Sequence, residues 1–346
     1  MRLLIITQKV DRNDPVLGFF HRWIEEFSKN FEKVTVVCLE KGEYHLPQNV
    51  KILSLGKEER HSNVRYIIHF YEYIWQEREN YDVVFVHMNQ EYVLLGGLLW
   101  KLLNRKIVLW YTHRQVNLKL RIAEKLADAI LTSSEDSFGV KSGKVKYVGH
   151  GINTEIFKPM TRDWTSRILV SVGRITPIKN CQILLDSLSL LIKNDPKWQV
   201  VFIGDPVTNS DKAYKDKLEN KVKKNNIASN VQFIGSLTPT EIKDKFSEAF
   251  ASVNMTPTGG MDKVILESLA VGCPVFTSNV AFQNLFGKYS SLFIFKFDNI
   301  SDLVQKIESW KNQENKEDIV SELSNKVISG YSVSNVIEKI YRIFDE

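Results

Sequence analysis

Two cations and a glycine stand together after an apolar run in the second half of the chain. The run Ile168–Val172 leads into G-R-I-T-P-I-K-N, so Arg174 and Lys179 both follow a predicted strand. Ligands bind at the carboxyl ends of parallel strands, and a following helix N-terminus favours an anion. Two unit charges ~4 Å apart interact by about 4 kcal/mol at an effective dielectric of ~20. Arg174, Lys179 and Gly173 could therefore bind a diphosphate. When this segment is considered without the rest of the chain, the alternative is that the Arg and Lys are simply solvated in a loop.

A glycine pair and a buried acid form a second candidate group. Gly259 and Gly260 lack a Cβ, so backbone amides there can approach a ligand closely. The pattern after them predicts a helix from Lys263 to Val271, with Asp262 as its N-cap. Glu267 lies among apolar residues that cover most of this helix, where a carboxylate is costly unless it is hydrogen-bonded. Capping of a neighbouring backbone, or pairing with an Arg, is the alternative to binding a ligand.

The pattern around these groups predicts the scaffold that positions them. Apolar runs of strand length alternate with helical segments along the whole chain of 346 residues. This alternation is typical of doubly wound α/β domains, and the length suggests about two of them. We place Rossmann-like domains at residues 1–158 and 159–330, facing each other across a cleft. We expect the last helix, in residues 331–346, to pack back on the first domain.

The strands and helix nearest to the candidate groups are predicted from their apolar runs. In the second domain they are strands at Ile168–Val172, Gln199–Ile203 and Ala251–Asn254, and a helix at Cys181–Asn194. In the first domain, strands are predicted at Arg2–Thr7, Val83–His87 and Ile107–Tyr111. Near-continuous apolar runs of this length indicate strands that are covered on both faces of a parallel sheet.

Composition argues against several other classes of protein. The net charge of +5 is compatible with a small anionic ligand and is too weak to imply nucleic acid. Cys38, Cys181 and Cys273 lie far apart, so we expect buried free thiols rather than a disulfide framework or a zinc site. The first strand is not followed by G-x-G-x-x-G, which argues against a nicotinamide dehydrogenase. No apolar run reaches the ~20 residues of a membrane-spanning helix, so we expect a cytoplasmic protein.

Five segments occur in an order that matches a known family. They are G-H-G-I-N-T-E-I-F-K-P at residues 149–159, V-G-R-I-T-P-I-K-N at 172–180, V-Q-F-I-G-S-L at 231–237, the glycine pair and helix within 256–274, and Y-S-V-S-N-V-I-E-K-I-Y at 331–341. Together they resemble the retaining glycosyltransferases of the GT-B fold in glycosyltransferase family 4. The resemblance covers most of the chain.

The resemblance implies a role for each matching residue. Arg174 and Lys179 match the pair that binds the diphosphate of a nucleotide sugar and supports its departure. Glu267 matches the carboxylate that binds the ribose hydroxyls, and His113 matches a histidine near the reacting sugar carbon. The other donor-binding positions implied are Gly18 in a first-domain loop near the phosphates, Ser236 and Leu237 beside the base, and Gly259, Gly260, Met261 and Asp262 near the donor sugar or distal phosphate.

One position departs from the family pattern. The family usually has two glutamates eight positions apart, of which Glu267 is the second, and the first falls on Gly259. In the family, the first glutamate normally contacts the donor sugar. Its replacement by Gly259 therefore leaves open which donor is used and how active the enzyme is. Asp262 could return a carboxylate to the loop, but as an N-cap its oxygens would face backbone amides, and we favour the cap.

Other histidines compete with His113 for a role in the site. His87 ends a predicted strand, and we expect it to be structural or to line the cleft. His21 follows Gly18 closely and could face solvent or ligand. His150 stands where the family often has Asn, and we expect it to pack between the domains.

The resemblance implies a retaining hexosyltransferase of carbohydrate biosynthesis that uses a nucleoside diphosphate sugar, without a metal or another cofactor. The acceptor would be a hydroxyl of a glycan, a lipid or a small molecule. A catalytically silent protein that binds nucleotide sugars on the same fold is the alternative. The apolar helix near Trp100, with its basic end at Lys101, Arg105 and Lys106, has two interpretations. It could contact the inner membrane face peripherally, or it could pack on the sheet with its basic end in solvent. The donor base and sugar, acceptor, linkage and oligomeric state are left open.

Overall fold

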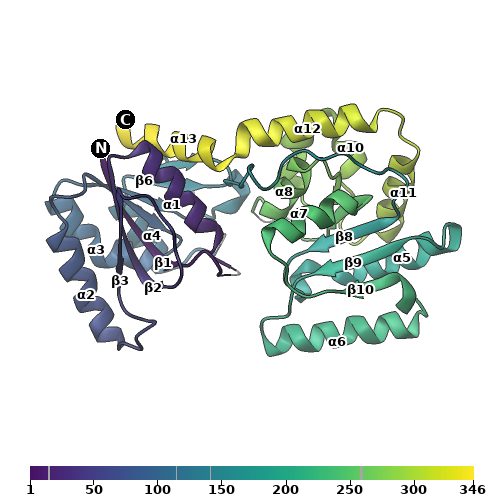
Figure 1. Ribbon diagram of the computed structural model, residues 1–346, viewed down its shortest axis with the longest axis horizontal. Coiled ribbons are helices and arrows are strands. Elements are labelled where there is room, and N and C mark those ends of the chain that lie inside the picture. The colour runs from purple at the N-terminus through teal and green to yellow at the C-terminus, as the bar shows by residue number, and fades with distance from the viewer. Residues whose placement is uncertain (15, 114, 141, 258–259) are drawn as a thin grey trace. The chain divides into compact units, whose positions relative to one another are not determined.

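The protein folds into two compact units, which are described separately (Figure 1). The computed structural model describes residues 1–14, 16–113, 115–140, 142–257 and 260–346. Unit 1 comprises Met1–Gly151 together with Ser332–Glu346, and unit 2 comprises Ile152–Tyr331. Ile152 and Phe157 are buried in the core of unit 2. The sequence pattern predicts that the second domain begins at residue 159. In the structure, unit 2 begins earlier, at Ile152.

Unit 1 is built on a parallel sheet of seven strands in the order β3-β2-β1-β4-β5-β6-β7. Its strands are β1 (Arg2–Val10), β2 (Lys33–Lys41), β3 (Val50–Ser54), β4 (Val83–His87), β5 (Lys106–Trp110), β6 (Ala129–Thr132) and β7 (Val145–Tyr147). Leu3 and Ile5 of β1 belong to one hydrophobic core, and Leu4 and Ile6 belong to another. Successive side chains point to opposite faces of a sheet, so a strand covered on both faces has the continuous apolar run seen in the sequence.

The helices of unit 1 form those two cores. They are α1 (Phe19–Asn30), α2 (Asn63–Gln76), α3 (Gln90–Leu102), α4 (Leu118–Leu126) and α13 (Val333–Asp345). Helix α13 buries Val336, Ile337 and Ile340 in the core that also contains α1. Lys106 Nζ donates a hydrogen bond to the carbonyl oxygen of Ile343, 2.6 Å away. The last helix of the chain is therefore part of unit 1.

Unit 2 is built on a second parallel sheet, with the strand order β10-β9-β8-β11-β12. Its strands are β8 (Ile168–Val172), β9 (Gln199–Ile203), β10 (Val231–Phe233), β11 (Ala251–Asn254) and β12 (Val275–Thr277). The order runs in one direction from β8 to β10 and in the other through β11, so the switch point lies between β8 and β11. Ligands of doubly wound sheets bind at the carboxyl ends of the strands beside such a point.

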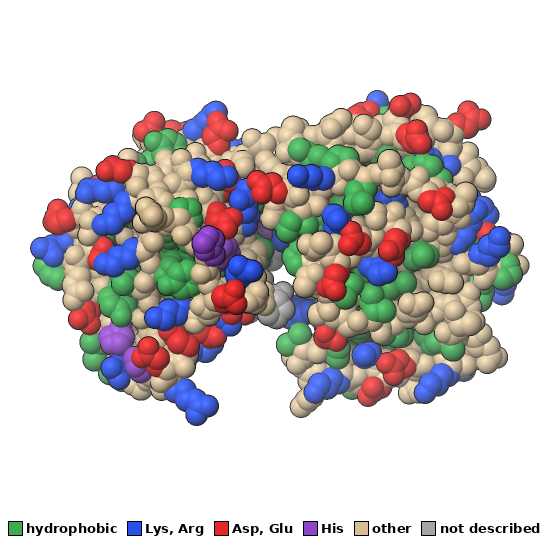
Figure 2. Space-filling view, viewed as in Figure 1, with side chains coloured by type: hydrophobic (Ala, Val, Ile, Leu, Met, Phe, Trp, Pro, Cys, Tyr) green, Lys and Arg blue, Asp and Glu red, His purple; other side chains and the backbone are tan. Residues whose placement is uncertain are grey.

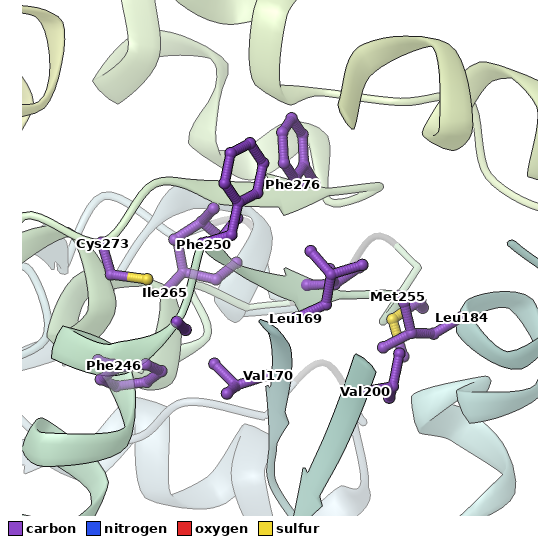
Figure 3. Packing of buried hydrophobic residues seen from close by; sticks show 14 of the residues in the cluster. Leu169, Val170, Leu184, Val200, Phe246, Phe250, Met255, Ile265, Cys273 and Phe276 are labelled. Atoms are coloured by element: carbon purple, nitrogen blue, oxygen red, sulfur yellow. The ribbon is translucent and has the colours of Figure 1, made fainter. Parts of the chain in front are cut away.

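The helices of unit 2 cover both faces of its sheet. They are α5 (Cys181–Asn194), α6 (Asn209–Lys224), α7 (Pro239–Glu248), α8 (Lys263–Ala270), α9 (Gln283–Phe286), α10 (Ser290–Phe293), α11 (Ile300–Lys311) and α12 (Lys316–Tyr331). Figure 3 shows buried side chains of β8 gathered with Val200 of β9, Leu184 of α5 and Ile265 of α8. The prediction of two doubly wound α/β domains is confirmed by the two parallel sheets.

Helix α3 does not present the surface that a membrane contact through Trp100 would need. Trp100 is fully buried, and its ring meets that of Phe70 edge-on with the centroids 6.0 Å apart. Lys101 is paired with Asp128, and Arg105 donates a hydrogen bond to the carbonyl oxygen of Arg78. Trp100 is thus a packing residue, whereas Leu98 and Leu102 of the same helix are 68% and 84% exposed. None of the described helices is long and apolar enough to cross a membrane.

Charged side chains of both signs are interspersed on the face of the molecule shown in Figure 2. Many charged side chains of the described residues are paired at the surface, for example Lys221 with Asp186 at 2.6 Å. No extended surface of one sign is visible on this face, which agrees with the modest net charge of +5.

The three cysteines are free and buried, as the sequence predicts. Burial raises the pKa of the Cys38 thiol and that of the Cys181 thiol to about 12. These thiols are therefore protonated at neutral pH, and they act as packing residues.

Candidate functional site

The carboxyl end of β8 turns sharply at two glycines of neighbouring strands. Gly173 has a φ of +140° and Gly204 a φ of +137°, a region that L side chains rarely adopt. A Cβ on Gly204 would lie 2.2 Å from the carbonyl oxygen of Gly173. The ends of β8 and β9 approach so closely here that Gly204 has no room for a side chain without a backbone shift.

A small pocket lies at the switch point of the unit 2 sheet. Arg174 and Lys179 line it on the side of β8, and Asn254 and Met255 line it on the side of β11. The guanidinium of Arg174 is exposed and makes no hydrogen bond or ion pair with any described residue. A Cβ on Gly173 would lie 3.3 Å from Cε of Lys179. The absence of a side chain at Gly173 thus leaves room for the lysine stem beside the strand end.

Lys179 is held by a carboxylate from a distant part of the chain. Its Nζ lies 2.5 Å from Oδ2 of Asp262, and Asn254 Nδ2 donates to the same oxygen at 2.9 Å. Asp262 does occupy the N-cap position of α8, but its side chain makes no capping hydrogen bond. Asp262 is thus at the predicted N-cap position, but a cation and an amide donor from other elements of the unit reach its carboxylate.

The loop before α8 is fixed by an amide on its other side. Asn279 is fully buried, and its Nδ2 donates to the carbonyl oxygen of Gly260 at 3.1 Å. Met261 packs against the core of unit 2. Gly259, where the family pattern has its first glutamate, lies outside the described residues.

Helix α8 buries the acid that the sequence singled out. Glu267 is 6% exposed, and its Oε1 lies 2.9 Å from Nζ of Lys263, one turn earlier on the same helix. Ile265 and Leu266 beside it are fully buried, as their positions in the sequence predict. The partner of this carboxylate is thus a lysine of its own helix, and its role toward a ribose stays a prediction.

The segment after β10 carries the predicted base-binding residues. The backbone N–H of Ser236 donates to Asp205 Oδ2 at 2.9 Å, and Leu237 packs against the core. Hydrogen bonds from Ser236 hold the pKa of the Asp205 carboxyl below its ordinary value. Asp205 follows β9 directly, so the ends of β9 and β10 are tied together at the same edge of the sheet as the pocket.

In unit 1, Gly18 begins α1 under a steric constraint from its own loop. A Cβ at this position would lie 2.5 Å from the carbonyl oxygen of Asp14. The Asp14 carboxylate accepts hydrogen bonds from the backbone of Val16 and Leu17, and it lies 3.0 Å from Nζ of Lys9. The structure therefore gives Gly18 a local reason to be glycine, and its approach to phosphates stays a prediction.

The four histidines singled out in unit 1 differ in exposure. His113 is exposed after β5, with its ring 5.8 Å from that of Tyr111. His21 is buried and accepts a hydrogen bond at Nε2 from the backbone of His45. The ring of His150 lies edge-on to Trp110 within the same unit. A catalytic role for His113 stays a prediction.

His87 is a buried residue of the unit 1 core rather than a surface group. Its ring stacks on Phe20 with the centroids 3.9 Å apart, and its Nδ1 lies 3.2 Å from Oγ1 of Thr7. Burial, together with the nearby His150, lowers the pKa of His87 to about 3. The imidazole is therefore neutral in the folded protein across the physiological pH range.

This burial predicts a dependence of stability on pH. A histidine has a pKa of about 6.5 when unfolded, so unfolding takes up a proton below that pH, and stability falls as the pH drops from about 6.5 toward 3. One such group contributes a slope of at most about 1.4 kcal/mol per pH unit. In urea unfolding at pH 7.5 and pH 5.0, we expect His87→Asn to lose less stability on acidification than the parent. Equal losses would contradict the assignment.

Comparison with protein families decides what kind of protein carries this pocket. Residues 153–327 match the family described as glycosyl transferases group 1, and residues 16–116 match glycosyl transferase 4-like. The first match alone spans half of the chain. This chain belongs to the glycosyl transferases group 1 family. The resemblance found in the sequence is thus confirmed, and the protein is a glycosyltransferase.

Individual relatives of this group 1 glycosyltransferase are distant. It is 23% identical over 287 residues to a lipopolysaccharide core biosynthesis mannosyltransferase, LpsB, of Rhizobium meliloti, covering 76% of this chain and 80% of the relative. It is 25% identical over 177 residues to a D-inositol 3-phosphate glycosyltransferase of Streptosporangium roseum, covering 46% of this chain and 40% of that protein.

Among solved structures, the group 1 glycosyltransferase resembles Anabaena HepE in complex with UDP, with a TM-score of 0.78 at 15% identity and full coverage of both chains. A sucrose-phosphate synthase from Thermosynechococcus elongatus gives a TM-score of 0.78 at 13% identity, covering 100% of this chain and 98% of the other. These likenesses concern the fold.

Two residues of the glycosyltransferase pocket region were missed by sequence reasoning. Asn254 is the last residue of β11, and Asp205 comes just after β9. Both are polar residues at the carboxyl ends of buried strands, which is the signal that singled out Arg174 after β8. Applied to every strand of the sheet, the same criterion would have found them.

Proposed function

We propose that this glycosyltransferase moves a hexose from a nucleoside diphosphate sugar to an acceptor hydroxyl, with retention of the anomeric configuration. In this proposal unit 2 binds the donor and unit 1 contributes the acceptor side. The acceptor is a glycan, a lipid or a small molecule in the cytoplasm. UDP is the first nucleotide to test, because HepE was solved with UDP and with UDP-glucose.

The main support for the proposal is that Arg174 and Lys179 line the same pocket at the switch point of the sheet. Both side chains line the same pocket, and the guanidinium is exposed and has no partner among the described residues. Guanidinium and ammonium groups are strong donors to phosphate oxygens, and the guanidinium can bind in a bidentate manner. Such a site can stabilise the charge that develops on a departing diphosphate, which lowers the barrier to transfer.

The proposed mechanism needs no residue to form a bond to the sugar. As the glycosidic C–O bond to the β-phosphate breaks, the acceptor oxygen attacks the same face of the anomeric carbon. The departing phosphate oxygen takes the proton of the acceptor hydroxyl. Arg174 and Lys179 supply the positive charge in this scheme, so the proposal includes no metal and no other cofactor.

A panel of sugar nucleotides tests the proposal. The protein is incubated with UDP-, GDP- and ADP-sugars, and release of the nucleoside diphosphate is measured with and without simple glycan acceptors. Slow release without acceptor is expected for at least one donor, because water can replace the acceptor hydroxyl. No release from any donor, together with binding of a nucleotide sugar, would favour the catalytically silent alternative.

A further inference from the structure

We propose that Asp262 is a positioning residue that fixes the ammonium group of Lys179 in the pocket, rather than a helix cap or a ligand of the donor sugar. The inference rests on the proposed function of that pocket. It also explains what a carboxylate does in a loop whose expected glutamate position is Gly259.

Asp262 and its two side-chain partners belong to three separate elements of unit 2. Asp262 itself precedes α8, Asn254 ends β11, and Lys179 lies in the 3₁₀ turn Pro177–Lys179 that follows β8. Asn254 is 5% exposed, and its two amide atoms have different partners: Nδ2 donates to Asp262, while Oδ1 accepts from the backbone of Thr256 at 3.2 Å. The amide is thus held in one orientation, and it holds the carboxylate in turn.

The lysine would otherwise have considerable freedom. A lysine side chain is flexible, and ordering it costs rotamer entropy. Here the Lys179 side chain is 23% exposed, and its ammonium group already lies 2.5 Å from the carboxylate. An ammonium group has three protons. With one directed to Asp262, the others remain for phosphate oxygens, so the cation is ordered before a ligand arrives.

The carboxylate also changes the charge of the pocket. Burial opposes ionisation of Asp262, but the charge and hydrogen bond of Lys179, together with hydrogen bonds from the Asn254 side chain and the Val264 backbone, hold the pKa of the carboxyl below its ordinary value. Asp262 is therefore ionised at neutral pH and offsets one of the two cations contributed by Arg174 and Lys179. A negative group beside a diphosphate weakens ground-state binding. Positioning and affinity should thus respond in opposite directions when the carboxylate is removed.

A double-mutant cycle separates these roles. The parent, Asp262→Asn, Lys179→Ala and the double variant are compared in kcat for UDP release from UDP-glucose, or from the donor found in the panel. The dissociation constant for UDP is measured by calorimetry in each. We expect Asp262→Asn to lower kcat by about tenfold or more while UDP binds at least as tightly as to the parent. On the Lys179→Ala background the same substitution should change kcat by less than about twofold.

The ion pair between Asp186 of α5 and Lys221 of α6 provides a matched control. Its two charged atoms lie 2.6 Å apart, and neither residue lines the pocket. Asp186→Asn should leave kcat unchanged. A similar loss of kcat from Asp262→Asn in both Lys179 backgrounds would overturn the positioning role, because the carboxylate would then act independently of the lysine. Weaker UDP binding in Asp262→Asn would also overturn it.

Failure of the proposed function itself would look different. A parent that neither binds UDP nor releases a nucleoside diphosphate from any donor would overturn the function, and the role of Asp262 with it. If the parent turns over the donor and Asp262→Asn has the same kcat as the parent, only the role of Asp262 would be overturned.

Discussion

Replacing Lys179 with alanine is expected to lower turnover of a nucleotide sugar by about 100- to 1,000-fold. A preorganised donor to developing negative charge contributes about 3–4 kcal/mol to the barrier, which corresponds to this range. Lys179 meets the requirement for preorganisation, because Asp262 already holds its ammonium group at the pocket. Steady-state release of the nucleoside diphosphate measures the effect. Acceptor binding should change far less than kcat, since unit 1 provides the acceptor side in this scheme.

Two controls separate chemistry from folding in this experiment. Lys179→Ala leaves the Asp262 carboxylate without its cation, which destabilises the folded state when the carboxylate is partly buried. The double variant Lys179→Ala/Asp262→Asn removes both charges, so it should recover melting temperature but not turnover. Lys221→Ala, at the surface pair with Asp186, should retain parental turnover. A Lys179→Ala variant as active as the parent would contradict the assignment of the diphosphate site.

Replacing Glu267 with alanine is expected to weaken nucleotide binding by about 10- to 100-fold. A hydrogen bond to a charged group contributes about 1.5–3 kcal/mol, and removal of the carboxylate removes every bond to the ribose that it accepts. Comparing UDP with 2′-deoxy-UDP by calorimetry isolates this contact. The parent should prefer UDP, and Glu267→Ala should bind the two nucleotides nearly alike.

The control for Glu267 is another acid of the same unit. Glu248 lies at the surface end of α7, paired with Lys245 at 2.8 Å, and Glu248→Ala should keep the preference for UDP. If Glu267→Ala also keeps that preference, the carboxylate serves only its ion pair with Lys263, and the ribose assignment is wrong.

The fold could be predicted from the sequence where local patterns determine it. Strands β8, β9 and β11 and helix α5 have the predicted bounds, because each apolar run ends at a glycine or a polar residue. Helix α6 begins at Asn209, since Thr208 and Asp211 form a capping box. That signal lies in the sequence as a threonine followed three residues later by an acid.

The candidate site could be predicted only in part. Arg174, Lys179 and Glu267 were singled out from residue type and position, and all three lie in unit 2 with the first two in one pocket. The partner of Asp262 could not be predicted, because Lys179 is 83 positions away and the pair forms only when two strand ends meet. Local propensity favoured the cap, and tertiary contacts with a buried amide and a cation override such preferences.

Burial of whole helices is the other kind of information that the sequence lacked. The sequence pattern of an apolar helix with a basic end is the same whether the helix faces lipid or packs on a sheet. Trp100 is fully buried and Lys101 is paired, so the structure rules out a contact through Trp100, while a membrane contact by other residues stays a prediction.

Calorimetric titration of UDP and UMP tests most directly whether the pocket at the ends of β8 and β11 binds a diphosphate. We expect the parent to bind UDP at least about tenfold more tightly than UMP, because the second phosphate would gain Arg174 and Lys179 as partners. In an Arg174→Ala/Lys179→Ala variant this preference should largely disappear. Equal affinity of the parent for UDP and UMP, or a preference that survives in the double variant, would contradict the site.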